Sequence, residues 1–380
     1  MKALAADVVV IGGGIMGAAA AFFLRRRGRS VVLIERGLIG QQASGVNFGN
    51  VRRQGRYLPQ LPLAHRSRAI WGKLKELLGE DAEFLATGHI RVCYDAKQLE
   101  VLESYARKAR DYGLELEMVS RNALRARFPF IGPEPIAGSF SPEDGHANPR
   151  LAAPAFGRAA LRAGAQVFEN TEVLSVQKAG ADFEVAAADG RRFRAPAVLV
   201  TAGAWGGQLS AQAGEPVPVA VHGPQMAVTE PLPYWIKPVI GVCTAIAEEV
   251  VYLRQVQRGN VVFGGGRRGP AFTDAPRAYV LPQNTLAQVK QIRRLVPALG
   301  TARVIRTWSG VESYLPDDIP IMGPSARLSG LYYAFGFCGH GFQLGPGVGD
   351  VMAELIARGA TSTPIEPFHI QRFARADYAA

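Results

Sequence analysis

The chain has 380 residues, of which 48% are hydrophobic and 20% charged, an ordinary globular balance that allows one large or two intertwined domains. Lys and Arg (43) outnumber Asp and Glu (32), but the basic residues are scattered. The longest basic run, Arg25 to Arg27, suits a helix end better than a nucleic-acid patch. Three cysteines have no metal-ligand spacing, which predicts no metal site and fits a reducing compartment.

The apolar amino-terminal stretch is interrupted by Gly12, Gly13 and Gly14, so its uninterrupted apolar run is too short to span a bilayer. No small-residue cleavage site follows it. We therefore expect no transmembrane segment, and a location in the cytoplasm or, peripherally, at the cytoplasmic face of the inner membrane.

The first predicted unit is a strand, a glycine turn and a helix. Residues 7–11 are a β-branched run typical of a strand buried on both faces, and an Ala-rich amphipathic segment reaches about Arg27. Between them lies G-x-G-x-x-G, and a second apolar strand over 30–34 ends at Glu35. Gly12 permits the turn, Gly14 lets a pyrophosphate approach the backbone, and Gly17 lets the helix pack closely on the strand. With Glu35 placed to accept ribose hydroxyls, this unit predicts a dinucleotide site.

Further along the chain, apolar alternation predicts strands at 166–173, 183–187 and 197–202, a β-rich region near 220–230 and 249–265, and helices near 63–78, 96–112 and 283–297. A short strand at 331–335 precedes a glycine-rich stretch and a helix from about Gly349 to Arg358. So many glycines suggest backbone amides that lie against a ligand.

Several motifs lie along nearly the whole chain: VVVIGGGIMG, NTEVLSV, VLVTAGAWGG, VYLRQVQRGNVVFGGG, RTWSGVESYLPDDIPIMG and GFCGHGFQLGPGVG. In this order they resemble the D-amino-acid oxidase superfamily of flavoproteins, which includes glycine oxidase, monomeric sarcosine oxidase and D-amino acid dehydrogenase. The last motif is similar to the flavin-ring loop of the sarcosine oxidase branch.

The resemblance implies an α/β fold, in which a Rossmann-type FAD-binding domain is interleaved with an α+β substrate domain built on a mostly antiparallel sheet. The FAD-binding domain would comprise residues 1–80, 145–215 and 315–380. The substrate domain would comprise residues 81–144 and 216–314.

The resemblance also implies a set of FAD contacts, with FAD bound non-covalently because the 306–323 segment offers no cysteine for attachment. The implied contacts are Gly12, Gly14, Ile15, Met16 and Gly17 at the pyrophosphate, Glu35 and Arg36 at the ribose, Ala43 and Ser44 along the ribityl path, Val173 at the adenine, and Phe337, Cys338, Gly339, His340, Gly341, Phe342 and Gln343 around the flavin.

The implied activity is oxidation of the CH–NH bond of an amino acid, imino acid or N-substituted amino acid, with hydride transfer to flavin N5. A planar guanidinium suits the substrate carboxylate, so we expect the anchor at Arg52 or Arg53, with Arg254 in reserve. Tyr252 and His340 are further substrate-facing candidates. Where relatives place a carboxylate-binding arginine the chain has Glu312, and where sarcosine oxidases place a lysine it has Gln343. Glu312 would instead favour a cationic amine or a guanidinium.

Other functions fit the same pattern. The chain could be the flavin subunit of a hetero-oligomeric dehydrogenase of the hydroxyproline or opine type, which passes electrons to a partner or a quinone in place of oxygen. An RNA-modifying oxidoreductase is a weaker alternative, because no aromatic-basic interleaving supports it. A nicotinamide dehydrogenase and a non-catalytic FAD-binding protein are further alternatives.

Overall fold

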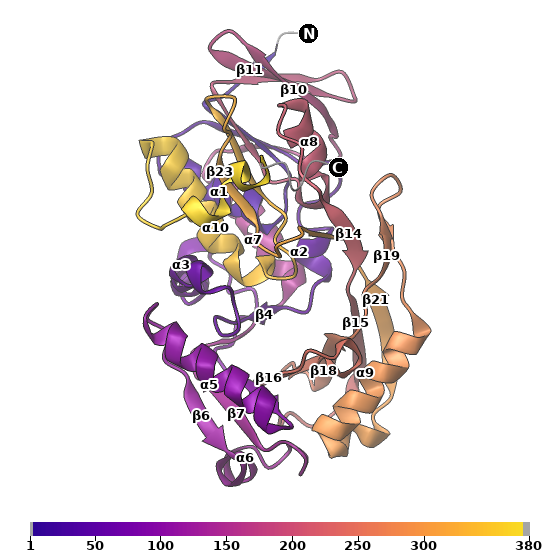
Figure 1. The fold of residues 1–380 in the computed structure, drawn as a ribbon. Coiled ribbons are helices and arrows are strands. Elements are labelled where there is room, and N and C mark those ends of the chain that lie inside the picture. Colours follow the sequence, from indigo (N-terminus) through magenta and orange to yellow (C-terminus); the bar gives the residue numbers. More distant parts are fainter. Residues whose placement is uncertain (1–2, 375–380) are drawn as a thin grey trace.

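The computed structural model describes residues 3–374, and its two largest sheets lie in opposite halves of the molecule (Figure 1). The upper half in Figure 1 holds a six-stranded sheet with α1 and α10, and the described part of the chain begins and ends there. The lower half holds an eight-stranded sheet with α5, α6 and α9. Among the described residues, no helix combines the length and the apolar character that a membrane span requires.

The six-stranded sheet has the order β23-β24-β13-β2-β3-β9 and is parallel except for the β23–β24 pair. Its strands are β2 (Val8–Ile11), β3 (Val31–Ile34), β9 (Gln166–Phe168), β13 (Ala197–Val200), β23 (Ile321–Pro324) and β24 (Leu331–Phe335). All of them fall within the segments expected for the FAD-binding domain. The sequence thus brings three distant stretches of the chain into one sheet.

Alternate side chains of β2 enter two different cores, as the period of a strand requires. Val8 and Val10 pack in the helical core, whereas Val9 and Ile11 pack on the opposite face. The helices of the first face are α1 (Ile15–Arg26), α2 (Ala43–Val46), α3 (Leu61–Trp71), α4 (Leu74–Leu78), α7 (Pro149–Arg162) and α10 (Gly341–Arg358). On the second face lies a four-stranded sheet of β1 (Leu4–Ala5), β10 (Val173–Ala179), β11 (Asp182–Ala187) and β12 (Arg192–Ala195), and α8 (Gly206–Gln212) contacts β10.

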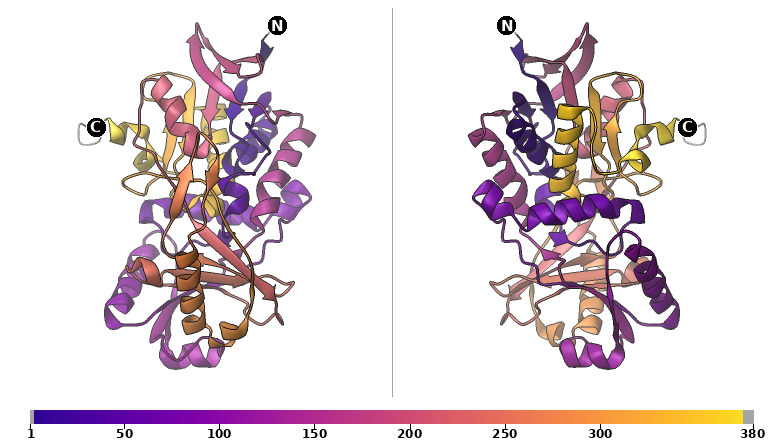
Figure 2. Two further views of the ribbon diagram at one scale, coloured as in Figure 1. Left: turned by 90° about the vertical axis from the view of Figure 1, so that its right-hand side faces the viewer. Right: turned by 90° about the vertical axis from the view of Figure 1, so that its left-hand side faces the viewer.

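The eight-stranded sheet has the order β21-β15-β18-β17-β16-β5-β7-β6, and only its β16–β5 pair is parallel. Its strands are β5 (His89–Cys93), β6 (Glu117–Ser120), β7 (Ala137–Ser141), β15 (Gln225–Pro231), β16 (Val239–Val242), β17 (Val251–Gln255), β18 (Asn260–Gly265) and β21 (Val304–Ser309). They fall within the two segments expected for the substrate domain. The helices α5 (Ala96–Arg110), α6 (Arg121–Arg127) and α9 (Pro282–Leu295) lie in the same half, as both views of Figure 2 show.

Two smaller sheets complete the fold. One joins β14 (Ala220–Gly223), β19 (Gly269–Phe272), β20 (Arg277–Ala278) and β22 (Glu312–Tyr314). The other pairs β4 (Asn50–Val51) with β8 (Gly145–His146). The fold is therefore the interleaved α/β arrangement that the sequence predicted.

One predicted element boundary is wrong, because α10 begins at Gly341 and not near Gly349. Its glycines at four-residue spacing let α10 lie against α1: a methyl group on Gly345 would meet Ile15 at 2.4 Å, and one on Gly349 would meet Ala19 at 2.5 Å. Gly347 is equally close to Ser67 of α3. Close helix packing explains these glycines, which normally weaken a helix interior, and so they do not all serve a ligand as the sequence suggested.

Candidate functional site

One cavity of about 800 Å³ connects the two halves of the molecule. It is lined by the turn after β2, the loop after β3, the segment from α2 to Arg56, the start of β10, the turn after β13, and the loop before α10. From the other half, the strand end near Gly265, Tyr252 and β22 contribute to the lining. A cavity of this size suits a cofactor together with a small substrate.

The first glycine turn is held by backbone contacts. Gly12 has a φ of 105°, and a side chain there would collide with the carbonyl of Thr201 at 2.6 Å. Gly17 lies still closer to the turn, since a methyl group on it would meet the Gly12 carbonyl at 1.9 Å. The start of α1 has no side-chain cap from Gly14, and the Ile15 amide donates to Ser44 Oγ at 2.9 Å. The positive end of α1 therefore opens onto the cavity.

Glu35 is fixed by the turn that it faces. Its Oε2 accepts a hydrogen bond from the Gly13 amide at 2.6 Å, and its Oε1 accepts one from the Gly37 amide at 2.8 Å. Each carboxylate oxygen has a second lone pair, so Glu35 can still accept from a ribose hydroxyl.

The end of the cavity near β10 carries a stacked pair that the sequence analysis did not predict. The Arg36 guanidinium lies 3.9 Å above the Trp205 ring, and Arg36 also pairs with Glu172. Val173, expected near the adenine, lines the same end. A flat indole and guanidinium provide a surface on which an aromatic base can stack.

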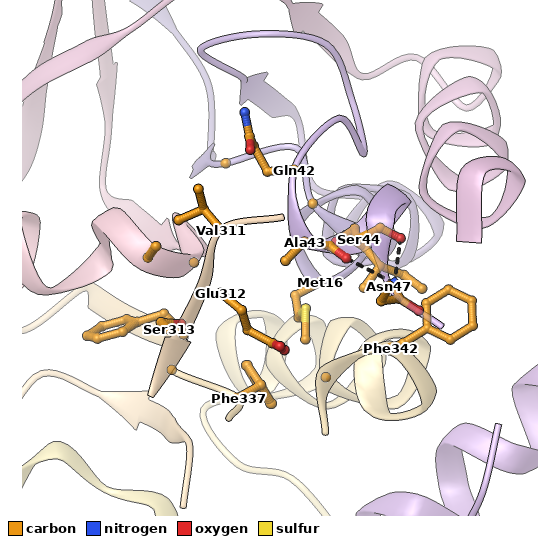
Figure 3. Close-up of a pocket in the computed structure, with 18 of the residues that line it drawn as sticks. Met16, Gln42, Ala43, Ser44, Asn47, Val311, Glu312, Ser313, Phe337 and Phe342 are labelled. Carbon is orange, nitrogen blue, oxygen red and sulfur yellow. Dashed lines mark hydrogen bonds between the residues drawn. The ribbon is translucent and has the colours of Figure 1, made fainter. Parts of the chain in front are cut away.

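The second glycine loop precedes α10, whose start has no side-chain cap from His340. Cys338 adopts a left-handed φ of 49°, and its amide donates to the Ser313 carbonyl of β22 at 3.2 Å. This contact joins the loop to the substrate half. Figure 3 shows Phe337 of this loop among the residues that line the cavity, together with Met16 and Glu312. The amino-terminal ends of α1 and α10 thus both line one cavity.

Glu312 joins β22 to the second glycine loop. Its Oε1 accepts a hydrogen bond from the Gly339 amide at 2.9 Å, and its Oε2 accepts one from the Tyr314 hydroxyl at 2.9 Å. Burial raises the pKa of the Glu312 carboxyl, although both hydrogen bonds oppose this shift. Figure 3 shows its carboxylate pointing into the space beside Met16.

The segment after β4 presents two of its three arginines to the cavity. Arg52 lines the cavity, and so does Arg56, which the sequence analysis did not single out. Arg53 does not line it. The Arg53 guanidinium pairs with Asp144 at 2.9 Å and with Glu143 at 2.9 Å, and it is 8% exposed. Asp144 also accepts from the Arg53 amide, so Arg53 attaches the segment to the chain before β8.

Of the next two substrate-facing candidates, Tyr252 and Arg254, only one lines the cavity. Tyr252 lines the cavity, packs edge-on against Phe48 at 4.6 Å, and has a pKa raised by burial to about 12. Arg254 does not line it, because its guanidinium donates to the Phe48 carbonyl at 2.7 Å and lies beside His146. Of the substrate-facing candidates, only four therefore line the cavity, namely Arg52, Tyr252, Glu312 and His340.

His340 and Gln343 have quite different surroundings. Burial, with several arginines nearby, places the pKa of His340 well below its usual range, so the ring is neutral. Its Nδ1 is buried without a hydrogen-bond partner. The Gln343 amide instead donates to the Ala64 carbonyl of α3 at 2.9 Å. Gln343 thus attaches α10 to α3, although it also lines the cavity.

Comparison with known proteins gives this arrangement its family. The family model described as "FAD dependent oxidoreductase" (DAO) matches residues 7–355. The chain belongs to this family. It is similar to glycine oxidase of Geobacillus kaustophilus (strain HTA426), at 28% identity over 91% of this chain and 91% of that protein. It is also similar to sarcosine oxidase subunit beta of Rhizobium meliloti (strain 1021), at 28% identity over 91% of this chain and 82% of that one.

Among solved structures, L-proline dehydrogenase from P.horikoshii is similar at 28% identity and a TM-score of 0.91, over 98% of this chain and 99% of that one. The predicted family and fold are therefore confirmed, and the chain is an FAD-dependent oxidoreductase.

The residues of the cavity fit FAD. The amino-terminal ends of α1 and α10, which both line the cavity, can neutralise the pyrophosphate and the electron-rich edge of the flavin. Glu35 has free acceptor capacity for a ribose, and Trp205 with Arg36 offers a surface for the adenine. Near the second loop, the buried Asn50 Oδ1 has no hydrogen-bond partner in the described structure.

Sequence reasoning missed Arg56, Trp205, Asn50 and Arg268, all of which line the cavity. Trp205 lies in the VLVTAGAWGG motif, and Arg56 follows Arg52 by four residues, so both had a usable signal. Asn50 and Arg268 had none, because only the fold brings them to the cavity.

Proposed function

We propose that this flavoenzyme oxidises the CH–NH bond of an amino acid, an imino acid or an N-substituted amino acid. The bound FAD would supply the electron sink, accepting a hydride at N5. The observation that carries the proposal is Arg52: its guanidinium lines the cavity, and among residues 3–374 no carboxylate pairs with it. Arg52 is half-buried, and its Nη1 donates to the Gln54 carbonyl, a neutral group that leaves the positive charge uncompensated. Such a charge favours an anionic ligand.

In this proposal Arg52 binds the substrate carboxylate through two parallel hydrogen bonds, which also fixes the orientation of the α-carbon. Glu312 lies near the amine and attracts its cationic form. Its raised pKa favours uptake of a proton from that ammonium, which leaves the neutral amine that releases a hydride. Tyr252 and the neutral His340 would complete the substrate wall.

We further propose that FAD is held without a covalent bond. Cys338 is the thiol nearest the presumed flavin, but its Sγ lies 3.1 Å from the Gly336 carbonyl, and burial raises its pKa to about 12. A thiol that resists ionisation is a poor nucleophile. Acid precipitation should therefore leave the yellow colour in the supernatant; a yellow pellet would contradict this proposal.

The central experiment is anaerobic mixing of the yellow protein with D- and L-amino acids, N-alkyl amino acids, imino acids and opines. Bleaching of the flavin absorbance by at least one of these compounds is expected. Simple amines that lack a carboxylate should bleach it much more slowly, because they offer nothing to Arg52. If no amine in the panel bleaches the flavin, the proposed function is wrong.

A second candidate concerns the electron acceptor. The similarity to sarcosine oxidase subunit beta favours a role as the flavin subunit of a larger dehydrogenase. In that case an artificial dye should reoxidise the reduced protein rapidly, while oxygen yields hydrogen peroxide slowly. Rapid peroxide formation by the isolated chain would instead identify an oxidase.

A further inference from the structure

The cavity carries an excess of positive charge on the side formed by the segment after β4. Arg52 and Arg56 line the cavity there, and Arg91, which does not line it, lies near Arg52. No carboxylate of the described residues lies within ion-pair distance of any of the three. The nearest acid, Asp144, is already paired with Arg53. Burial lowers the pKa of Arg52 to about 10 and that of Arg56 to about 9, and in each case a neighbouring arginine adds to the shift.

The geometry brings these groups close together. Arg56 is 4% exposed, and its Nε donates to the Arg52 carbonyl at 2.9 Å while its Nη1 donates to the His340 carbonyl at 3.2 Å. A methyl group on Gly55 would lie 2.5 Å from Arg91 Nη1 and 3.4 Å from Arg52 Nη1, so the guanidiniums of Arg52 and Arg91 both lie beside Gly55. The hydrogen bond to His340 connects Arg56 to the loop that precedes α10.

The segment is held firmly, so the arginines cannot easily turn away. Gln54 donates to the His89 carbonyl at 2.7 Å and accepts from Ser139 Oγ at 2.8 Å. The Arg53 guanidinium donates to Asp144, which directly precedes β8. Since the fold supplies neutral carbonyls but no anion, a single substrate carboxylate would leave much of this charge uncompensated.

We infer that the substrate carries two carboxylates, one held by Arg52 and the other by Arg56. This inference rests on the proposed function and narrows it to amines with two acidic arms, such as an N-carboxyalkyl amino acid or an acidic amino acid. Glu312 would then bind the single cationic nitrogen between the two anionic groups. Two anionic groups and one cationic nitrogen in the substrate would thus complement Arg52, Arg56 and Glu312 in the cavity.

The first test uses the FAD-loaded protein and ligands that cannot react, namely glutarate and butyrate, which differ chiefly by one carboxylate. Titration followed by flavin absorbance and by calorimetry should give a Kd at least tenfold lower for glutarate. The Arg56→Gln variant should reduce that preference to less than threefold and change the Kd for butyrate by less than threefold. Arg107→Gln, an exposed arginine on α5, is the matched control and should leave both Kd values unchanged.

Equal affinity for glutarate and butyrate would overturn the inference. So would an Arg56→Gln variant that weakens both ligands equally, because Arg56 would then serve the flavin or a single carboxylate. If Arg56→Gln fails to retain flavin, the parent protein still supplies the test through its own affinities for glutarate and butyrate and through turnover.

Turnover gives an independent comparison between iminodiacetate and sarcosine, which differ by one carboxylate. A KM at least tenfold lower for iminodiacetate supports the inference, and a KM equal to or above that for sarcosine contradicts it. These results are distinct from failure of the proposed function, in which no amine of any kind would bleach the flavin. Even if no amine bleaches the flavin, the Kd for glutarate still tests whether Arg52 and Arg56 together bind two carboxylates.

Discussion

The carboxylate of Glu312 accepts a hydrogen bond from the Gly339 amide, 2.9 Å away, and so links the substrate half of the molecule to the loop before α10. The same carboxylate faces the cavity in which the amine is proposed to bind. A single side chain therefore holds the loop and, in the proposed site, would also set the charge near the substrate nitrogen.

Replacing Glu312 should separate these two roles. Glu312→Gln keeps an oxygen that can accept from Gly339 but removes the charge, so the KM for amines should rise at least tenfold, about 1.4 kcal/mol, with flavin retained. Tyr314→Phe is the matched control, because it removes the hydrogen bond to Oε2 and leaves the charge. Glu312→Arg should shift preference towards simple amino acids, and an identical substrate profile would remove Glu312 from the substrate site.

Arg52 and Arg53 are adjacent, and their variants should differ in kind. Arg52→Met should raise the substrate KM at least tenfold and change the free energy of unfolding little, because Arg52 has no acidic partner. Arg53→Met leaves Asp144, which is fully buried, without its cation, so the protein should lose about 3–5 kcal/mol of stability. Steady-state kinetics together with urea unfolding of both variants would check this. If Arg52→Met instead lost stability and Arg53→Met instead raised the KM, Arg53 would be the substrate anchor and Arg52 the structural residue.

Gly14→Val should give a folded but colourless protein. The backbone at Gly14 (φ −64°, ψ 178°) accepts any L-residue, and the new Cβ would meet only Ser44 Oγ, at 3.1 Å. The side chain would nevertheless occupy the space before α1 where the pyrophosphate is proposed to bind. Gly300→Val is the control, since its Cβ would meet only the Arg293 side chain, at 3.4 Å. Circular dichroism and flavin absorbance measure the two properties separately, and a yellow Gly14→Val protein would contradict the assignment.

Glu354 predicts a pH dependence of stability. Burial raises its pKa, but hydrogen bonds from Arg66 and Thr361 outweigh burial and lower the pKa to about 2. The folded carboxyl therefore ionises more readily than the unfolded one, and its contribution is complete above about pH 4.5 and is lost as the pH falls towards 2. Glu354→Gln should cost up to about 3 kcal/mol in urea unfolding at pH 7, and the difference from the parent should shrink below pH 4.5. A difference that stays constant from pH 7 to pH 3 would contradict this.

The sequence predicted those parts of the fold that are encoded by neighbouring residues. The β2–turn–α1–β3 unit has all its signals within 30 residues, and its strands and helix lie within one or two residues of the predicted positions. The start of α10 could not be predicted, because its glycines and Pro346 resemble a loop until α1 and α3 pack against them. Which of Arg52 and Arg53 faces the cavity was likewise undecidable, since the choice depends on Asp144, 91 residues further along the chain from Arg53.

The interleaving of the six-stranded sheet has a consequence for biosynthesis. β2 lies between β3 and β13, and β24 pairs with β13 only after residue 331 has been made, shortly before α10 covers α1. Until then a nascent chain exposes Ile15, Ala19 and the rest of the α1 surface that α10 buries. The cavity also takes part of its lining from residues 336–343, so it is complete only once the loop before α10 has been synthesised.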